Sequence, residues 1–226
     1  MTFSTRIKPL DEQVRILRDA FPDLAMPDLG FAGRCVTPPE ADGWFATISF
    51  KAGADPAAFL RQFIAGRFAE LVPFRNDIGD LTDPSRYGHG GFGDILRAMT
   101  RAMQGQPDIV LFPGTFGNRH PERCARDVRA LRLTKEEFLL GVPDALCLLL
   151  THPERLGAMG APAIVCGADM VRRPQGRGAL EVPVLSAAYF GTLLTAIGEN
   201  ETGTCLSTPS GFAPIFAEHT DTGISA

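Results

Sequence analysis

The feature of this sequence that most constrains its fold is a change of pattern near residue 162. Before it, apolar residues recur at helical spacing, as Leu10, Val14 and Leu17 do in a predicted helix over 9–21. After it, short apolar segments are punctuated by glycine and proline, which is typical of strands. These segments are 163–169, 178–198 and 203–216. We therefore predict an α+β fold with a mixed β-sheet packed by several helices and a strand-rich C-terminal third.

No stretch of linker composition divides the chain, so residues 1–226 are interpreted as one globular domain. Glutamate three residues after threonine indicates capping boxes at Thr134–Glu137 and Thr151–Glu154, each opening a helix. Further strands are predicted over 29–36, 43–50 and 108–112. Further helices are predicted over 56–71, 94–104, 122–131 and 135–150.

The composition is that of a globular protein, with 45% hydrophobic and 21% charged residues. Five cysteines without a C-x-x-C pair indicate reduced thiols and a cytoplasmic protein. The first residues lack the apolar core of a signal peptide. The longest apolar run, 138–150, is too short to span a bilayer and contains Gly141, Pro143 and Asp144, so we expect no membrane span.

The charge balance limits the partners of this protein. A net charge of −4 disfavours general affinity for nucleic acid. Only Lys8, Lys51 and Lys135 are lysines, and none follows a glycine as in a phosphate-binding P-loop. We therefore expect no nucleic-acid partner, and any anion recognition falls mainly to arginine.

A glycine-rich segment matches the G-x-G-x-x-G pattern between Gly88 and Gly93. A dinucleotide site needs a buried strand directly before that loop, and the preceding residues are turn-like instead. A loop that enters a helix capped by Asp94 explains the pattern more simply. An anion-binding loop of another kind, contacted by Arg86 and His89, stays open as an alternative.

A second segment offers a better context for a site. The strand predicted over 108–112 leads into a glycine-containing loop and then into a basic helix. Ligands in α/β folds bind beyond the carboxyl ends of strands, and a helix N-terminus with nearby arginines suits a carboxylate or phosphate. From 117 to 135, six basic residues stand against two acidic ones, a net charge of +4. The predicted ligand-binding residues here are Gly114, Gly117, Arg119, Arg123 and Arg126.

Two residues are candidates for catalysis. His120 lies in the same loop, and Asp169 closes a predicted buried strand, where a carboxylate can act as a general base. Cys166 has no identifiable base beside it in the sequence and is interpreted as a buried structural thiol. The segment HPER occurs at 120–123 and at 152–155, and we interpret it as a helix-initiation pattern.

Metal and cofactor signatures are not found in the sequence. His120 and Cys124 are four residues apart, but a zinc site needs further ligands that the neighbouring sequence lacks. We therefore predict no metal site and no cofactor.

The sequence leaves two functions of different class open. The first is binding of an anionic small molecule, with hydrolase or transferase chemistry as an unresolved extension. The second is a non-catalytic interaction or assembly protein whose basic helix, 119–132, docks on an acidic protein partner. Homo-oligomer formation is left open under both.

Overall fold

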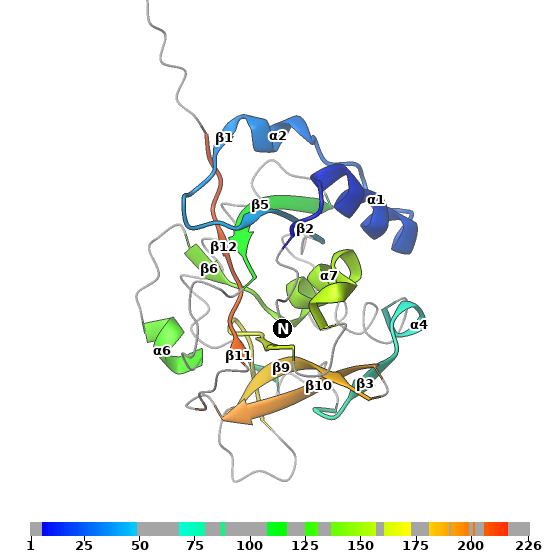
Figure 1. The fold of residues 1–226 in the computed structure, drawn as a ribbon, viewed down its shortest axis with the longest axis vertical. Helices are drawn as coiled ribbons and strands as arrows, with labels where there is room; N and C mark the ends of the chain where they lie inside the picture. Colours follow the sequence, from blue (N-terminus) through cyan, green and yellow to red (C-terminus); the bar gives the residue numbers. More distant parts are fainter. Residues whose placement is uncertain are drawn as a thin grey trace, which may run out of the picture.

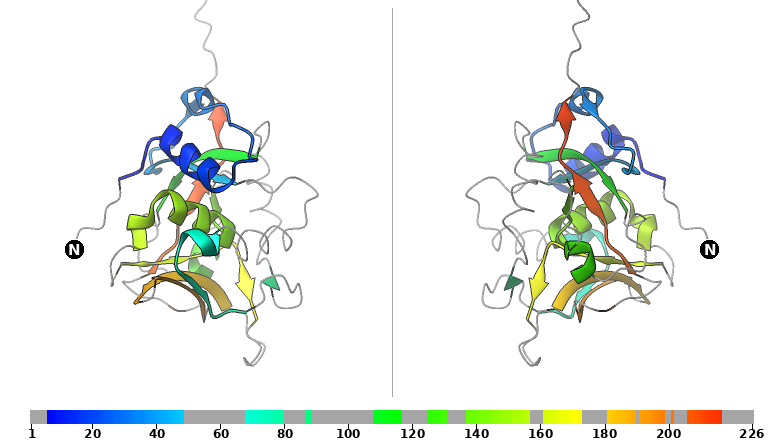
Figure 2. Two further views of the ribbon diagram at one scale, coloured as in Figure 1. Left: turned by 90° about the vertical axis from the view of Figure 1, so that its right-hand side faces the viewer. Right: turned by 90° about the vertical axis from the view of Figure 1, so that its left-hand side faces the viewer.

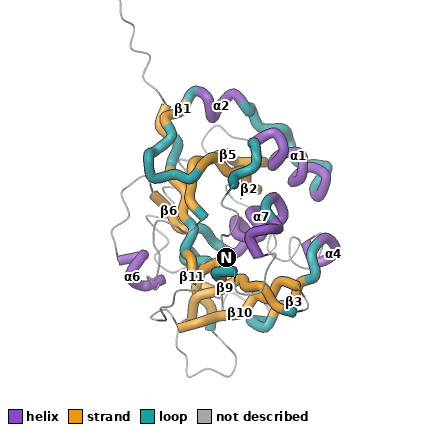
Figure 3. Tube along the Cα trace, in the orientation of Figure 1, coloured by secondary structure: helices purple, strands orange, loops and turns teal. Residues whose placement is uncertain are grey.

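The computed structural model describes residues 6–48, 68–79, 87–88, 108–116, 125–130, 137–156, 161–172, 181–189, 191–198, 201 and 206–216. They form an α+β fold with mixed sheets, and strands dominate the C-terminal third (Figures 1 and 3), as predicted. The described helices are α1 (Leu10–Ala20), α2 (Gly30–Gly33), α4 (Ala69–Leu71), α6 (Ala125–Ala130), α7 (Val142–Thr151) and the 3₁₀ helix η2 (Pro153–Leu156).

The larger sheet has its strands in the order β11-β7-β9-β10-β3, and β8 links β4 to β9. The long β9–β10 hairpin is antiparallel, whereas β10 with β3 and β11 with β7 are parallel pairs. Its strands are β3 (Phe74–Asn76), β4 (Tyr87–Gly88), β7 (Ala163–Val165), β8 (Met170–Val171), β9 (Glu181–Ala188), β10 (Gly191–Gly198) and β11 (Leu206–Ser207).

The second sheet has four antiparallel strands in the order β2-β5-β12-β6. A separate two-stranded ribbon pairs β1 with β13. The strands are β1 (Cys35–Val36), β2 (Gly43–Ile48), β5 (Ile109–Thr115), β6 (Glu137–Leu139), β12 (Ser210–Phe212) and β13 (Ile215–Phe216).

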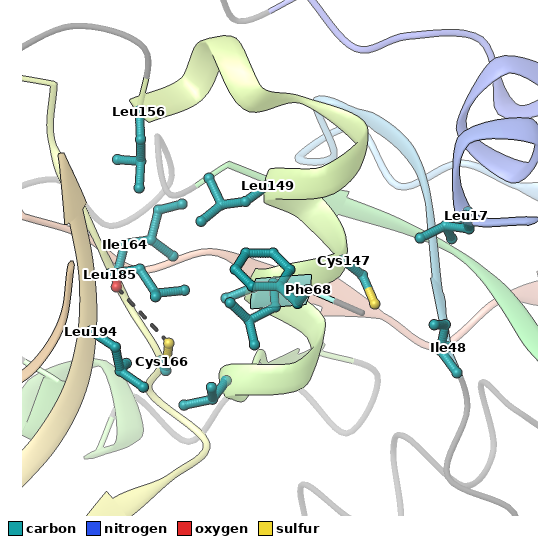
Figure 4. Packing of buried hydrophobic residues seen from close by; sticks show 14 of the residues in the cluster. Leu17, Ile48, Phe68, Cys147, Leu149, Leu156, Ile164, Cys166, Leu185 and Leu194 are labelled. Carbon is teal, nitrogen blue, oxygen red and sulfur yellow. Dashed lines mark hydrogen bonds between the residues drawn. The ribbon is translucent and has the colours of Figure 1, made fainter. Parts of the chain in front are cut away.

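Helix α7 lies between the two sheets and is buried along almost its whole length (Figures 1 and 2). A helix that is apolar on every side is expected in such a position. In Figure 4, Leu149 extends toward Ile164 and Leu185 of the larger sheet, while Cys147 lies on the side of Ile48. One apolar cluster therefore joins both sheets through this helix.

Strand β5 is one of the two inner strands of the four-stranded sheet and is buried on both faces. Ile109 and Leu111 belong to the cluster around α7, whereas Val110 and Phe112 belong to a second cluster on the opposite face. This alternation follows from the two-residue period of a strand. The end of β5 is therefore fixed from both sides.

The helix α1 is joined to β2 by a buried glutamine. Gln13 Nε2 donates to the carbonyls of Lys8 and Trp44, at 2.7 and 2.9 Å, and Gln13 Oε1 accepts the Ala46 N–H at 3.0 Å. The side chain thus satisfies backbone groups on the edge of β2 that β5 does not reach. It also fixes the carbonyl of Lys8, in the segment just before α1.

Three sequence-based expectations are corrected by the structure. The strand predicted over 29–36 is α2 followed by the short strand β1, and the buried helix predicted to begin at residue 135 begins at Val142. Glu137–Leu139 is strand β6 instead, because it pairs with β12 from far along the chain. Thr151, predicted to open a new helix, is instead the last residue of α7, and its hydroxyl donates back to the Cys147 and Leu148 carbonyls.

Other expectations agree with the structure or fall outside its described part. Helix α1, strand β2 and the β9–β10 hairpin lie within the predicted ranges. The helix predicted over 94–104 lies outside the described residues, and only 68–71 of the helix predicted over 56–71 are described. Among the described residues, no helix is both long enough and apolar enough to cross a bilayer.

Candidate anion-binding site at the end of strand β5

The predicted ligand loop begins later than expected, because β5 continues through Gly114 and Thr115. The Gly114 carbonyl accepts the Asp42 N–H at 2.8 Å, and a Cβ on Gly114 would lie 2.8 Å from the Ser210 carbonyl oxygen. Gly114 therefore permits the close approach of β12. The strand ends at Thr115, and Phe116 directly after it is buried.

Arg155, from η2, lies against Phe116. Its Nη2 donates to the Phe116 carbonyl at 3.2 Å and to Ser207 Oγ at 2.7 Å, and its Nη1 donates to the Pro162 carbonyl at 3.4 Å. The guanidinium carbon lies 5.9 Å from the centre of the Phe116 ring. Ser207 Oγ in turn donates to the Phe116 carbonyl at 3.3 Å. Three regions distant in sequence thus meet around one guanidinium group: Phe116, Arg155 with the nearby Pro162, and Ser207.

The charge of Arg155 is buried without an opposite charge. Only 5% of the residue is exposed, and its partners are two backbone carbonyls, one hydroxyl and one aromatic ring. Across the described part of the chain, no carboxylate lies within ion-pair distance of it. Burial lowers the pKa of Arg155, yet a guanidinium stays protonated in a protein.

His152 precedes Arg155 by one turn and packs against the same phenylalanine. Its ring centre lies 5.1 Å from that of Phe116 and 6.0 Å from that of Phe45, in edge-to-face contacts. Burial lowers the pKa of His152 to about 4. His152 is therefore neutral near pH 7, and Arg155 carries the positive charge of this corner.

Thr208 follows Ser207, and its side chain is fully buried with no hydrogen-bond partner for Oγ1 among the described residues. Its methyl carbon would lie 3.2 Å from a Cβ on Gly167. An unpaired buried hydroxyl costs free energy. Thr208 is therefore, next to Ser207 and close in sequence to the contact with Arg155, a buried polar group whose hydrogen bonding is incomplete among the described residues.

Asp169, predicted to be catalytic, lies in the turn between β7 and β8. It is 3% exposed, and its Oδ2 accepts the Val142 N–H at 2.6 Å, which satisfies one of the free amides at the start of α7. A Cβ on Gly141 would lie 2.8 Å from the same oxygen. Asp169 is thus held against the helix N-terminus.

A second carboxylate, Asp144, shares this helix N-terminus. Its Oδ2 accepts the Gly141 N–H at 3.1 Å, and its Oδ1 accepts the Thr47 hydroxyl at 3.0 Å. Burial raises the pKa of Asp144 to about 6, and the negative charge of Asp169 adds to the effect. The sequence-based analysis identified only one member of this pair of carboxylates.

Cys166 is buried close to these carboxylates, and its Sγ–H points to the Ile164 carbonyl at 4.0 Å. Burial, followed by the charges of Asp169 and Asp144, raises the pKa of Cys166 well above its ordinary value. A thiol in this state is a poor nucleophile. These contacts agree with its interpretation as a structural residue.

The remaining predicted site residues divide into two groups. Arg126 is exposed on α6, whose Val128 packs into the second apolar cluster, and only 125–130 of the predicted basic helix are described. The others lie outside the described residues and stay predictions: Arg86, His89, Gly117, Arg119, His120 and Arg123. The described residues contain no group of three or more His, Cys, Asp or Glu side chains that could hold a metal ion.

Arg155 and Ser207 were missed as candidates by the sequence analysis. The signal for Arg155 was the second HPER segment, which was interpreted as helix initiation only. No local pattern links Ser207 to it, because 52 residues separate the two. The two residues come into contact only in the folded chain.

The fold places this chain in the α+β class, and the described residues define a buried arginine corner at the end of β5. No protein-family model, no curated protein and no solved structure matches the chain.

Proposed function

We propose that this protein binds an anionic small molecule, a carboxylate or a phosphate, through Arg155 at the end of β5. The observation that carries the proposal is a buried guanidinium held only by neutral acceptors in the described structure. Carbonyl and hydroxyl oxygens satisfy N–H groups but do not neutralise a charge. Burying such a charge without a counter-ion is costly.

The hydrogen-bond count supports the same proposal. A guanidinium has five N–H donors, and the three described acceptors take three of them. Hydrogen bonds from a guanidinium to a carboxylate or phosphate are about twice as strong as those between neutral groups. An anion that reaches the remaining donors supplies both the missing acceptor and the missing charge.

The position of Arg155 fits the ligand-binding segment predicted from sequence. Phe116, whose carbonyl and ring both contact Arg155, is directly followed in the chain by the segment that carries Arg119 and His120. Those two residues, and any hydrolase or transferase chemistry using His120, remain predictions. The proposal itself requires only Arg155.

The test is a thermal-shift screen at constant ionic strength with inorganic phosphate, phosphorylated metabolites and small carboxylates. A ligand at about 100 times its Kd adds about 2.7 kcal/mol to the free energy of unfolding, which raises the Tm by roughly 5 °C or more. We expect such a shift for the wild type and its loss in Arg155→Gln.

The matched control is Arg34→Gln, since Arg34 is an exposed arginine that already pairs with Asp28 at 2.6 Å. This variant should keep the full ligand shift. The proposal is overturned if no anion stabilises the wild type beyond chloride at equal ionic strength. It is also overturned if Arg155→Gln keeps the shift.

A further inference from the structure

The residues just before α1 are fastened to the end of α7 through one histidine. We call residues 6–9 the N-terminal strap. Within it, the Lys8 N–H donates to His152 Nε2 at 3.0 Å, and Lys8 Nζ donates to the Thr151 carbonyl at 2.6 Å. The Lys8 carbonyl is held by Gln13 at 2.7 Å. Lys8 therefore attaches the strap to the end of α7 by hydrogen bonds, while the neighbouring Ile7 packs on the second apolar cluster.

The hydrogen bonds fix which nitrogen of His152 carries the proton. Nε2 accepts the Lys8 N–H, so it is unprotonated, and the proton is on Nδ1, 2.8 Å from Thr151 Oγ1. Thr151 Oγ1 accepts that proton and donates to the Cys147 carbonyl at 3.0 Å. This network is complete only for the neutral imidazole.

We propose that protonation of His152 releases the N-terminal strap from α7, so that this attachment acts as an acid-sensitive clasp. A proton on Nε2 turns the acceptor of the Lys8 N–H in the described structure into a donor. Two N–H groups then face each other, and the hydrogen bond is lost. When the strap is released, the ring becomes accessible to water, and water accepts a hydrogen bond from the added proton on Nε2.

The charged groups around the ring act in opposite directions. Lys8 contributes an ammonium from the strap, and Glu154 contributes a carboxylate from η2, with the two 3.5 Å apart. Phe45 of β2 and Phe116, directly after β5, pack against the ring through their aromatic side chains, which carry no charge. Burial is the largest of these effects, and the lysine charge adds to it, so the attached state favours neutral His152.

The size of the effect follows from linkage. The pKa of His152 is about 4 when the strap is attached and takes the ordinary value of 6.5 when the ring is free. A pKa lowered in the attached state means that attachment is fully stabilised above pH 6.5 and weakens as the pH falls toward 4. Between pH 7.5 and pH 5.0 the opening equilibrium rises roughly 30-fold.

The experiment is amide hydrogen exchange by NMR at pH 7.5, 6.0 and 5.0, corrected for the intrinsic exchange rate at each pH. We expect protection of the Lys8 amide to fall roughly 30-fold from the highest to the lowest pH. Amides of the β9–β10 hairpin should keep their protection. A loss of equal size in both places would mean global unfolding and would overturn the proposal.

The matched variant is His152→Gln, whose amide oxygen accepts the Lys8 N–H and does not titrate. Its Lys8 protection should not change with pH, and pH dependence equal to that of the wild type overturns the proposal. Should this variant fail to fold, the comparison of Lys8 with the hairpin in the wild type decides by itself. None of these readouts depends on an anion binding at Arg155.

Discussion

Asp144 is a carboxylic acid placed where its charge is poorly tolerated. The residue is 2% exposed, next to Asp169, in the core that joins the two sheets. Hydrogen bonds from Gly141 and Thr47, and the positive end of the α7 dipole, favour its charged form, but burial outweighs them. The net result is a pKa of about 6, so Asp144 titrates within the range in which the protein can be handled.

The first prediction concerns the pH dependence of stability. Because folding raises the pKa of Asp144 from 3.8 to about 6, the folded state holds its proton more tightly than the unfolded state. Ionisation of Asp144 therefore lowers the free energy of unfolding progressively as the pH rises from 4 to 6, and the full loss is present above that range. Asp144→Asn removes the titration. We expect its free energy of unfolding, relative to the wild type, to rise by between about 1 and 2 kcal/mol from pH 5.0 to pH 7.5.

Urea unfolding followed by fluorescence of the single tryptophan, Trp44, measures this difference. Comparing variant with wild type at each pH cancels the opposite contribution of His152, whose folded pKa is lowered. The control is Asp19→Asn, since Asp19 is exposed and pairs only with Arg15 in the described ion pairs. The prediction would be contradicted if the difference in free energy of unfolding between Asp144→Asn and the wild type were the same at pH 5.0 and pH 7.5.

At the scale of elements, β5 and β12 approach closely because Gly114 faces Gly211, while β6 places Phe138 opposite the same glycine. Gly211 of β12 is the register partner of both Gly114 and Phe138. A Cβ on Gly211 would lie 2.5 Å from the Phe138 ring and 2.7 Å from that of Phe112. The rings occupy the space that a side chain on β12 would need, and the second apolar cluster depends on this arrangement.

The second prediction follows from that contact. Gly211→Ala should lower the free energy of unfolding by about 1–3 kcal/mol, because the two rings belong to a packed core and must shift. Gly33→Ala is the matched control, since a Cβ at that helical position meets nothing within 4 Å. It should leave stability unchanged or raise it by up to about 1 kcal/mol. Equal effects of the two variants in urea unfolding would contradict the prediction.

The boundary between β6 and α7 shows which elements local patterns can predict. The apolar run 138–150 correctly indicated burial, and the helix exists from Val142 onward. Its start was predicted too early because Thr134 and Glu137 match a capping box. Glu137 belongs instead to β6, which pairs with β12, and its carboxylate accepts the Ser210 hydroxyl at 2.7 Å. A pairing partner more than 70 residues away is invisible to a local pattern.

At the scale of the whole molecule, the sequence predicted the fold class, but it did not point to Arg155, the residue on which the proposed site depends. The segment after β5 was identified from a strand followed by glycine and arginine. Arg155 comes from η2 and lies against Phe116, the residue directly before that segment, and its guanidinium is held by Phe116, Pro162 and Ser207. Contacts between residues this far apart in the chain arise from tertiary packing, so the spacing of residues in the sequence does not predict them.

The last prediction tests whether the two sheets unfold together, as a single domain over 1–226 requires. Cys147 on α7 and Cys166 after β7 are fully buried in the cluster that joins the sheets. Burial raises the pKa of Cys147 to about 12 and that of Cys166 well above its ordinary value. Neither thiol should react with a maleimide in the folded protein, whereas the half-buried Cys35 should react before both of them.

Pulsed maleimide labelling across a urea series, followed by peptide mass spectrometry, gives the labelling midpoint of each cysteine. Since the side chains on both faces of α7 share one core, we expect Cys147 and Cys166 to become reactive at the same urea concentration, coincident with the Trp44 fluorescence transition. A lower midpoint for Cys166 alone would mean that the larger sheet separates from α7 before the rest unfolds. The chain would then consist of two cooperative units, and the interpretation of one domain would be wrong.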